Sequence, residues 1–252
     1  MKIAIVGHGR MGRMIEEIAL ERGHEIVAVI DIDNREDFAS EAFRSADVAI
    51  EFSVPASGAD NILECFRAGV PVVSGTTGFG DRLPHLEEMC RRGEGTLLHS
   101  TNFSIGVNIF RALNRYTARI MGDFPAYRPY MSETHHIHKL DHPSGTAVTL
   151  ADELVESHKG TEGWYEPTLP QEKKNEGNFM PVSTIREGEV PGIHTIKWES
   201  DVDYIALTHS AKSRAGFASG AVRAAEWLAG RKGFFTMGEM LSDITHTTDL
   251  FT

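Results

Sequence analysis

The sequence predicts an α/β protein with two domains, a doubly wound parallel-sheet domain and an α+β domain whose sheet is mostly antiparallel. Three observations predict this fold class. Short apolar, β-branched runs alternate with amphipathic stretches in the first half of the chain. A glycine-rich turn follows the first of these runs directly, and the pattern changes after Gly106. Regular alternation of strands and helices is typical of a parallel sheet covered by helices.

The first half of the chain supplies the elements of the parallel sheet in order. Its apolar runs are too short for helices and are rich in Ile and Val, which favours buried strands. Strands are predicted over residues 3–6, 26–32, 48–52, 70–73 and 96–99, and helices over 11–22, 60–68 and 83–92.

The second half of the chain begins with a predicted helix over 107–121, followed by alternating residues over 127–138. A further helix is expected over 147–155, and antiparallel strands over 182–211 with turns at Glu187-Gly188 and Ser200-Asp201. The polar segment 159–178 is expected to be a mobile loop. We therefore expect one domain to comprise residues 1–106 with 216–252, and the other to comprise 107–215.

Composition and charge exclude several classes of protein. The formal net charge is −11 and no dense Lys/Arg stripe occurs, which argues against nucleic-acid binding. Cys65 and Cys90 have neither zinc-site nor disulfide spacing and lie in predicted helices, as buried free thiols of a reducing compartment would. No run has the length of a signal peptide or a membrane span, so a cytoplasmic protein without membrane association is expected.

A glycine-rich motif, Gly7-His8-Gly9-Arg10-Met11-Gly12, lies between the first predicted strand and the first predicted helix. In a G-x-G-x-x-G motif, the first glycine permits a tight turn, the second lets the backbone approach a pyrophosphate, and the third allows close helix packing. The amino end of the helix then offers N–H groups to the anion. The motif predicts a Rossmann-like, dinucleotide-binding domain; a glycine-rich turn with only a structural role is the alternative.

Asp31 follows the second predicted strand, where a carboxylate is expected to bind the ribose hydroxyls of the dinucleotide. A carboxylate there accepts a free 2′-hydroxyl and repels a 2′-phosphate, which favours NADH. Arg10 and Arg35 are nearby cations that could offset this charge, so NADPH stays an alternative.

The segment from Glu133 to Ala147 contains four histidines and a lysine ahead of a Ser-Gly-Thr turn. The turn precedes a predicted helix, whose first N–H groups and the Thr146 hydroxyl can bind a carboxylate. Together with His136, Lys139 and Gly145, this arrangement favours a dicarboxylate substrate. A metal site is the alternative, with His135, His136, His138 and Asp141 as its ligands, but the alternation of a strand would point His135 away from the other two imidazoles, and no metal is predicted.

This segment resembles the signature of the 4-hydroxy-tetrahydrodipicolinate reductases, also called dihydrodipicolinate reductases. Their pattern is Glu-x-His-His-x-x-Lys-x-Asp-x-Pro-Ser-Gly-Thr-Ala, and every fixed position is present. The resemblance continues through residues 186–195 and 213–221. Family members often have a basic residue immediately after the acid that corresponds to Asp31, where this chain has Ile32.

The resemblance implies reduction of (2S,4S)-4-hydroxy-2,3,4,5-tetrahydrodipicolinate to tetrahydrodipicolinate by NAD(P)H, in diaminopimelate and lysine biosynthesis. It assigns His135 as the proton donor or acceptor and Lys139 as a second proton donor, and it implies a homotetramer built by the antiparallel sheet. Two loops that follow predicted parallel strands match family segments that line the nicotinamide side of the site. Their residues are Gly75, Thr76 and Thr77 in the first loop, and Ser100, Thr101, Asn102 and Phe103 in the second.

Two other functions remain as alternatives from the sequence. An aldehyde or sugar dehydrogenase shares the two-domain plan, but the former needs a nucleophilic cysteine, and Cys65 and Cys90 lie in poor contexts for one. A regulatory NAD-binding module would explain the glycine loop but would have no use for the histidine segment. His194 is left without a role, because a buried, hydrogen-bonded strand histidine explains it equally well.

Overall fold

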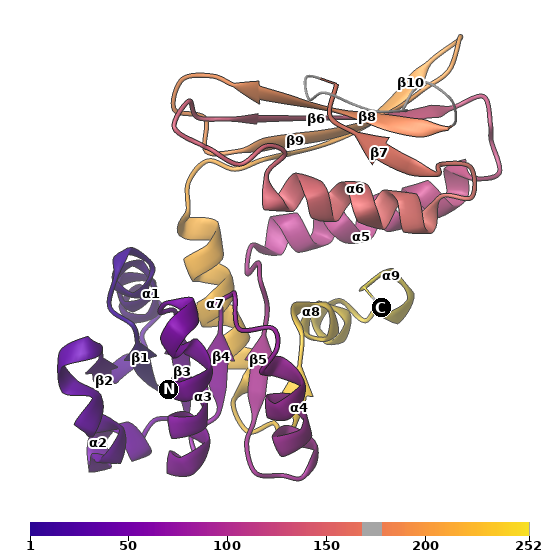
Figure 1. Cartoon of the computed structure of the whole chain (residues 1–252). Helices are drawn as coiled ribbons and strands as arrows, with labels where there is room; N and C mark the ends of the chain where they lie inside the picture. Colours follow the sequence, from indigo (N-terminus) through magenta and orange to yellow (C-terminus); the bar gives the residue numbers. More distant parts are fainter. Residues whose placement is uncertain (168–177, 252) are drawn as a thin grey trace. The chain divides into compact units, whose positions relative to one another are not determined.

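β1 (Lys2–Val6) is apolar after Lys2 and lies inside a six-stranded sheet, in the order β11-β5-β4-β3-β1-β2. All strand pairings in this sheet are parallel, as the alternation of strands and helices predicts. The computed structural model describes residues 1–167 and 178–251 and contains two units, of which this sheet forms the first (Figure 1). Its other strands are β2 (Glu25–Ile30), β3 (Val48–Glu51), β4 (Val72–Ser74), β5 (Leu97–His99) and β11 (Phe234–Phe235).

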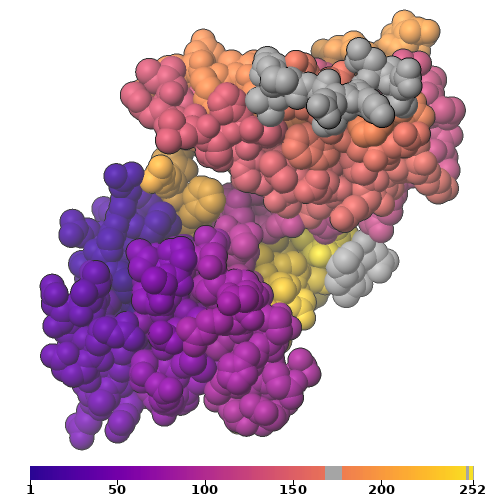
Figure 2. Space-filling model, in the orientation of Figure 1, coloured from indigo at the N-terminus to yellow at the C-terminus, as the bar shows by residue number. Residues whose placement is uncertain are grey.

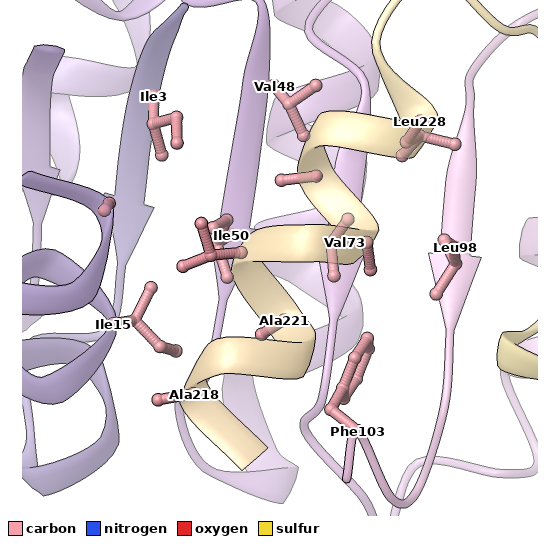
Figure 3. Packing of buried hydrophobic residues seen from close by; sticks show 14 of the residues in the cluster. Ile3, Ile15, Val48, Ile50, Val73, Leu98, Phe103, Ala218, Ala221 and Leu228 are labelled. Atoms are coloured by element: carbon pink, nitrogen blue, oxygen red, sulfur yellow. The ribbon is translucent and has the colours of Figure 1, made fainter. Parts of the chain in front are cut away.

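Helices cover both faces of this sheet because its strands are apolar on both sides. In β1, Ile3 and Ile5 belong to one buried cluster, whereas Ala4 and Val6 belong to another. Figure 3 shows the first cluster, in which α7 lies across the strands. The helices of this unit are α1 (Arg10–Glu21), η1 (Ile32–Ala39), α2 (Glu41–Arg44), α3 (Pro55–Ala68), α4 (Leu83–Arg91), α7 (Ala215–Leu228), α8 (Met237–Thr245) and α9 (Thr248–Phe251).

The first unit comprises Met1–Ile105 together with Ala215–Thr252, so the end of the chain packs with its beginning. In the space-filling view, the indigo and purple residues and the yellow C-terminal residues form one continuous body (Figure 2). α7 supplies Ala218, Ala221 and Leu228 to the core, and β11 extends the sheet beyond β5. The sequence analysis did not predict β11, η1 or α2, which are too short to show a periodic pattern.

The second unit, Gly106–Arg214, contains a five-stranded mixed sheet in the order β10-β9-β6-β8-β7. Two helices, α5 (Ile105–Met121) and α6 (Gly145–Ser157), contribute to its buried cluster, which is centred on Trp198, Leu150 and Met131. The strands are β6 (Arg128–His135), β7 (Gly163–Tyr165), β8 (Phe179–Arg186), β9 (Ile193–Glu199) and β10 (Tyr204–Ser210).

β6 is the central strand of this sheet, and it lies between β8 and β9. It pairs antiparallel with β9 and parallel with β8, so the Glu187-Gly188 turn does not close a hairpin. β7 lies in the polar segment for which the sequence predicted only a loop, and residues 168–177 of that segment lie outside the described residues. Within the described part of the chain, no helix has the length and apolarity needed to cross a membrane.

Candidate active site

The register of the mixed sheet brings four polar side chains together. Glu133 and His135 alternate with partly buried neighbours on β6 and are themselves buried. Glu133 lies opposite His194 of β9, and His135 lies opposite Arg186 of β8. Residues opposite each other in a sheet share a face, so the four side chains converge.

Glu133 is the centre of this cluster, and its side chain is fully buried. Its Oε1 accepts hydrogen bonds from the backbone N–H of Ser144 at 3.0 Å and from Arg186 Nη2 at 3.1 Å. Its Oε2 lies 3.3 Å from His135 Nδ1 and 3.6 Å from His194 Nε2. The two rings meet edge to face, with centroids 5.1 Å apart. The carboxylate of Glu133 thus contacts side chains from β8 and β9, the loop at Ser144, and His135, a candidate catalytic residue.

Burial opposes the charge of Glu133, but its hydrogen-bond partners outweigh that effect. His135, His194 and Ser144 hold the pKa of the carboxyl well below its usual value. Glu133 is therefore an anion at neutral pH, next to a histidine that can carry a proton.

Ser144 connects this cluster to the amino end of α6. Its hydroxyl accepts from the N–H of Ala147 at 3.2 Å and lies 3.2 Å from His194 Nε2. Gly145 and Thr146 form the first turn of α6, and both are at least partly accessible. A helix begins here because Ser144 is a good N-cap, and its first N–H groups form an anion site of the kind the sequence predicted.

Lys139 lies in the loop between β6 and α6, and its Nζ forms an ion pair with Asp141 Oδ1 at 2.8 Å. This pair holds the pKa of Asp141 below its usual value. Arg186 anchors this loop through two hydrogen bonds. Its Nη2 donates to the carbonyl oxygen of Asp141 at 2.6 Å, and its Nε donates to that of Lys139 at 3.3 Å. The loop that carries the candidate proton donor is thereby tied to β8.

The other histidines of the segment lie outside the strand, because β6 ends at His135. His136 is partly buried, and His138 is exposed and lies 3.2 Å from Glu189 Oε1. Among the described residues, the one group of three side chains close enough to share a metal ion is Glu133, His135 and His194. This is not the set that the sequence offered as the metal alternative. Its carboxylate already holds both imidazoles at ion-pair distances.

The first unit contains the glycine loop at the carboxyl end of β1. Gly7 has a φ of +87°, and a Cβ on Gly12 would lie 2.0 Å from the Gly7 carbonyl, so both positions require glycine. A Cβ on Gly9 would meet nothing within 4 Å, and α1 begins there without a side-chain cap. The open backbone at Gly9 and the uncapped helix end fit a pyrophosphate.

Asp31 lies beside this loop, since its Oδ2 accepts from the N–H of His8 at 3.3 Å. It also caps η1 through the N–H of Ile32 at 2.9 Å. Arg35 points its Nη1 to Asn61 Oδ1 at 2.6 Å and lies over Phe38, so it is engaged elsewhere. Arg10 is exposed. Asp31 thus places a carboxylate beside the glycine loop, where Glu16 also contacts His8 at 2.6 Å.

The two predicted cofactor loops follow β4 and β5, which are neighbours in the sheet, and β4 is next to β3. Thr77 and Thr101 are exposed, Gly75, Ser100 and Asn102 are partly buried, and Thr76 and Phe103 are buried. The Thr76 hydroxyl donates to Glu51 Oε1 at 2.9 Å, and the Phe103 ring belongs to the hydrophobic core. These two side chains hold their loops in place. The accessible side chains of the two loops are those of Thr77 and Thr101.

The sequence analysis gave no role to Glu133, Ser144 or Arg186, although all three lie in motifs that it quoted, and it left His194 open. One signal was available for Glu133: it is two residues before His135 on a predicted strand and therefore on the same face. Arg186 and His194 gave no comparable signal, because their approach depends on strand register.

Comparison with known proteins agrees with this geometry. A family model described as "Dihydrodipicolinate reductase, N-terminus" matches residues 1–103, and one described as "Dihydrodipicolinate reductase, C-terminus" matches residues 106–241. A curated 4-hydroxy-tetrahydrodipicolinate reductase of Christiangramia forsetii is 45% identical over 97% of this chain and 99% of its own length. One from Archaeoglobus fulgidus is 36% identical over 96% of this chain and all of its own length.

A solved structure has the same fold. It is a dipicolinate-bound dihydrodipicolinate reductase from Paenisporosarcina sp. TG-14, with a TM-score of 0.75 and 22% identity, and the match covers 94% of this chain and 97% of that one. Both family models, the near-complete coverage of the curated relatives and the shared fold lead to one conclusion: the chain belongs to the dihydrodipicolinate reductase family.

Proposed function

We propose that this chain reduces (2S,4S)-4-hydroxy-2,3,4,5-tetrahydrodipicolinate to tetrahydrodipicolinate, with loss of water, in diaminopimelate and lysine biosynthesis. The observation that carries the proposal is the 45% identity to a curated reductase over 97% of the chain. The cluster around Glu133 and His135 supports it, because a reduction by hydride needs a proton source beside an anion site. A cytoplasmic location fits such a biosynthetic enzyme.

The residues of the second unit would have two roles, substrate binding and proton supply. His136, Gly145 and Thr146 bind the carboxylates of the substrate, the last two through the amino end of α6. His135 and Lys139 supply protons, one to the carbon next to the site of reduction. The bound nicotinamide supplies the hydride, in the unit whose cofactor site comprises the glycine loop, Asp31 and the loops after β4 and β5.

The reaction is tested with substrate generated in place from pyruvate and aspartate semialdehyde by the upstream synthase. Oxidation of the reduced nicotinamide is followed by its absorbance, with His135→Gln and Lys139→Ala beside the unchanged chain. We expect both variants to lose turnover by about 10²-fold or more, and Lys139→Ala also to weaken substrate binding. Full activity in both variants would contradict the assigned site, and NADH binding without turnover would favour a regulatory module.

NADH is the proposed preferred cofactor, with NADPH as the alternative, because Asp31 places a carboxylate beside the glycine loop, where it would repel a 2′-phosphate. Asp31→Ala should shift the ratio of kcat/KM values toward NADPH by about ten-fold, which corresponds to roughly 1.4 kcal/mol of relieved repulsion. Asp31→Asn is the matched control for capping, since Asn also caps η1 but carries no charge. An unchanged ratio in both variants would contradict the assignment.

We also propose a homotetramer built through the mixed sheet. Tyr204 and Ile205 of β10 and Ile185 of β8 are among its exposed large apolar residues, a composition suited to contact between copies. Light scattering of the purified protein measures the assembly, and a monomer at micromolar concentration would contradict it.

A further inference from the structure

Glu133 is a buried charge that the proposed chemistry leaves unused. It lies behind His135 and does not reach the accessible turn at Gly145 and Thr146. Its four partners come from four places in the chain: His135 on β6, the Ser144 turn, Arg186 on β8 and His194 on β9. A carboxylate buried with this many partners is strongly oriented, because leaving any of them unpaired is costly.

We propose that Glu133 is a positioning residue that holds the proton donor, the substrate turn and the lysine loop in one arrangement. The inference rests on the proposed function for the roles of these three parts. Glu133 contacts His135 and the Ser144 turn directly, and it reaches the loop of Lys139 through Arg186 alone.

The first connection orients His135. Its Nδ1 lies 3.3 Å from Glu133 Oε2, which favours the tautomer with the proton on Nδ1 and leaves Nε2 to exchange a proton with a bound molecule. Gly192 leaves room at this second nitrogen, since a Cβ there would lie 2.9 Å from His135 Nε2.

The second and third connections fix the groups around the donor. Through the N–H of Ser144, Glu133 sets the residue that caps α6 and thus the position of Gly145 and Thr146. Through Arg186, which shares its Nη2 between Glu133 and the Asp141 carbonyl, it sets the loop that presents Lys139. Removing the charge therefore affects all three parts at once.

The test compares Glu133→Gln with a control, Glu153→Gln. Glu153 is a largely buried carboxylate on α6 in the same unit, and it pairs with Arg111 at 2.6 Å and Arg115 at 3.0 Å, neither of which belongs to the Glu133 cluster. We expect Glu133→Gln to lower kcat by about 10–100-fold with unchanged affinity for NADH. Glu153→Gln should lose stability but keep kcat.

Two readouts separate positioning from a general loss of structure. The first is the pH–rate profile, whose alkaline limb should move in Glu133→Gln only, because the buried carboxylate 3.3 Å from the proposed donor is gone. The charged and titratable groups around Glu133 are His135, His194 and Arg186, with His209 of β10 opposite His194. The second is the ¹⁵N chemical shift of the His135 ring, which reports the tautomer without any substrate.

The outcomes are distinct. Reduced kcat, a moved alkaline limb and a lost Nδ1–H tautomer in Glu133→Gln alone support the inference. Wild-type kcat and tautomer in that variant overturn it, and so does a loss of kcat with an unchanged tautomer. If the unchanged chain fails to turn over the substrate, the proposed function fails, and the tautomer of His135 in the two proteins then decides the positioning role by itself.

Discussion

At the scale of single residues, the buried ionisable groups of this chain behave in opposite ways according to their partners. Glu133 has partners that hold it ionised, whereas Glu51 at the end of β3 has a pKa raised by burial despite hydrogen bonds from Ser53, Ser74 and Thr76. The difference lies in the partners: His135, His194 and the Ser144 turn lower the pKa of Glu133 enough to outweigh its burial, whereas the hydroxyl and amide groups around Glu51 do not. Burial alone therefore does not predict the state of a carboxylate.

The depressed pKa of Glu133 makes a prediction about stability in acid. A carboxyl whose pKa is lowered on folding stabilises the protein above its unfolded pKa, near 4.5, and loses that contribution as the pH falls below it. The difference in free energy of unfolding between the unchanged chain and Glu133→Gln should thus be constant above about pH 5 and shrink below pH 4.5. Urea unfolding across this range measures it, and a difference that persisted into acid would contradict the ion-pair account.

The two cysteines should be inert in the folded protein. Both are buried, burial raises the pKa of Cys65 well above its ordinary value, and it raises that of Cys90 to about 11. At pH 8 a thiol with that pKa is ionised on the order of 10⁻³ of the time. A colorimetric disulfide reagent should therefore detect no thiol in native protein and both in urea. Rapid reaction of either thiol in the native protein would instead favour an aldehyde dehydrogenase with a nucleophilic cysteine.

At the scale of elements, close packing of α7 explains why its glycines differ in importance. A Cβ on Gly220 would lie 1.7 Å from the Phe103 carbonyl, so the helix touches the backbone of the loop after β5. A Cβ on Gly216 would lie 3.7 Å from Ser104 Oγ, an ordinary contact. The same helix thus offers one glycine that packing requires and one that it does not.

Alanine at these two positions should have opposite effects. Gly220→Ala must displace backbone and is expected to destabilise the protein by about 1–3 kcal/mol. Gly216→Ala removes the entropic cost of a helical glycine and should be neutral or stabilising by up to about 1 kcal/mol. Denaturant unfolding of both variants measures the difference, and equal effects would show that α7 packs less closely than described.

At the scale of the whole molecule, each unit has its own core, and the first depends on both ends of the chain. α7, β11 and α8 supply the buried cluster on one face of the parallel sheet, together with β1 and α1. The cluster of the second unit comes entirely from residues between Phe110 and Leu207. The units should therefore respond differently to truncation.

A chain that ends at residue 214 should lose the first unit and keep the second. Without α7, apolar residues such as Ile3, Ile50 and Val73 are left facing water, and the apolar surface that stabilises the sheet is no longer buried. We expect no NADH binding, but a native near-ultraviolet circular dichroism signal from Trp198, which is buried in the second unit. NADH binding by the truncated chain would contradict the two-ended core.

Long elements with a regular apolar period were predictable from the sequence. Very short strands, and contacts that depend on strand pairing, were not. The sequence predicted β1, α1, α5 and β6 within a few residues, because each has a clear apolar period. It missed β7 and β11, of three and two residues, which exist because they pair with β8 and β5. For the candidate site, it assigned roles to His135 and Lys139 through a linear signature but gave Glu133 no role.

The sequence by itself determined the fold class, the glycine loop and the family signature, because these depend on spacings of a few residues along the chain. Only the tertiary structure decided what surrounds the signature. Arg186 lies 53 residues from Glu133 along the chain. His194 lies 61 residues from it, the difference between positions 194 and 133. Their approach is set by the pairing of β6 with β8 and β9, and strand register is a property of the folded sheet that no local pattern encodes.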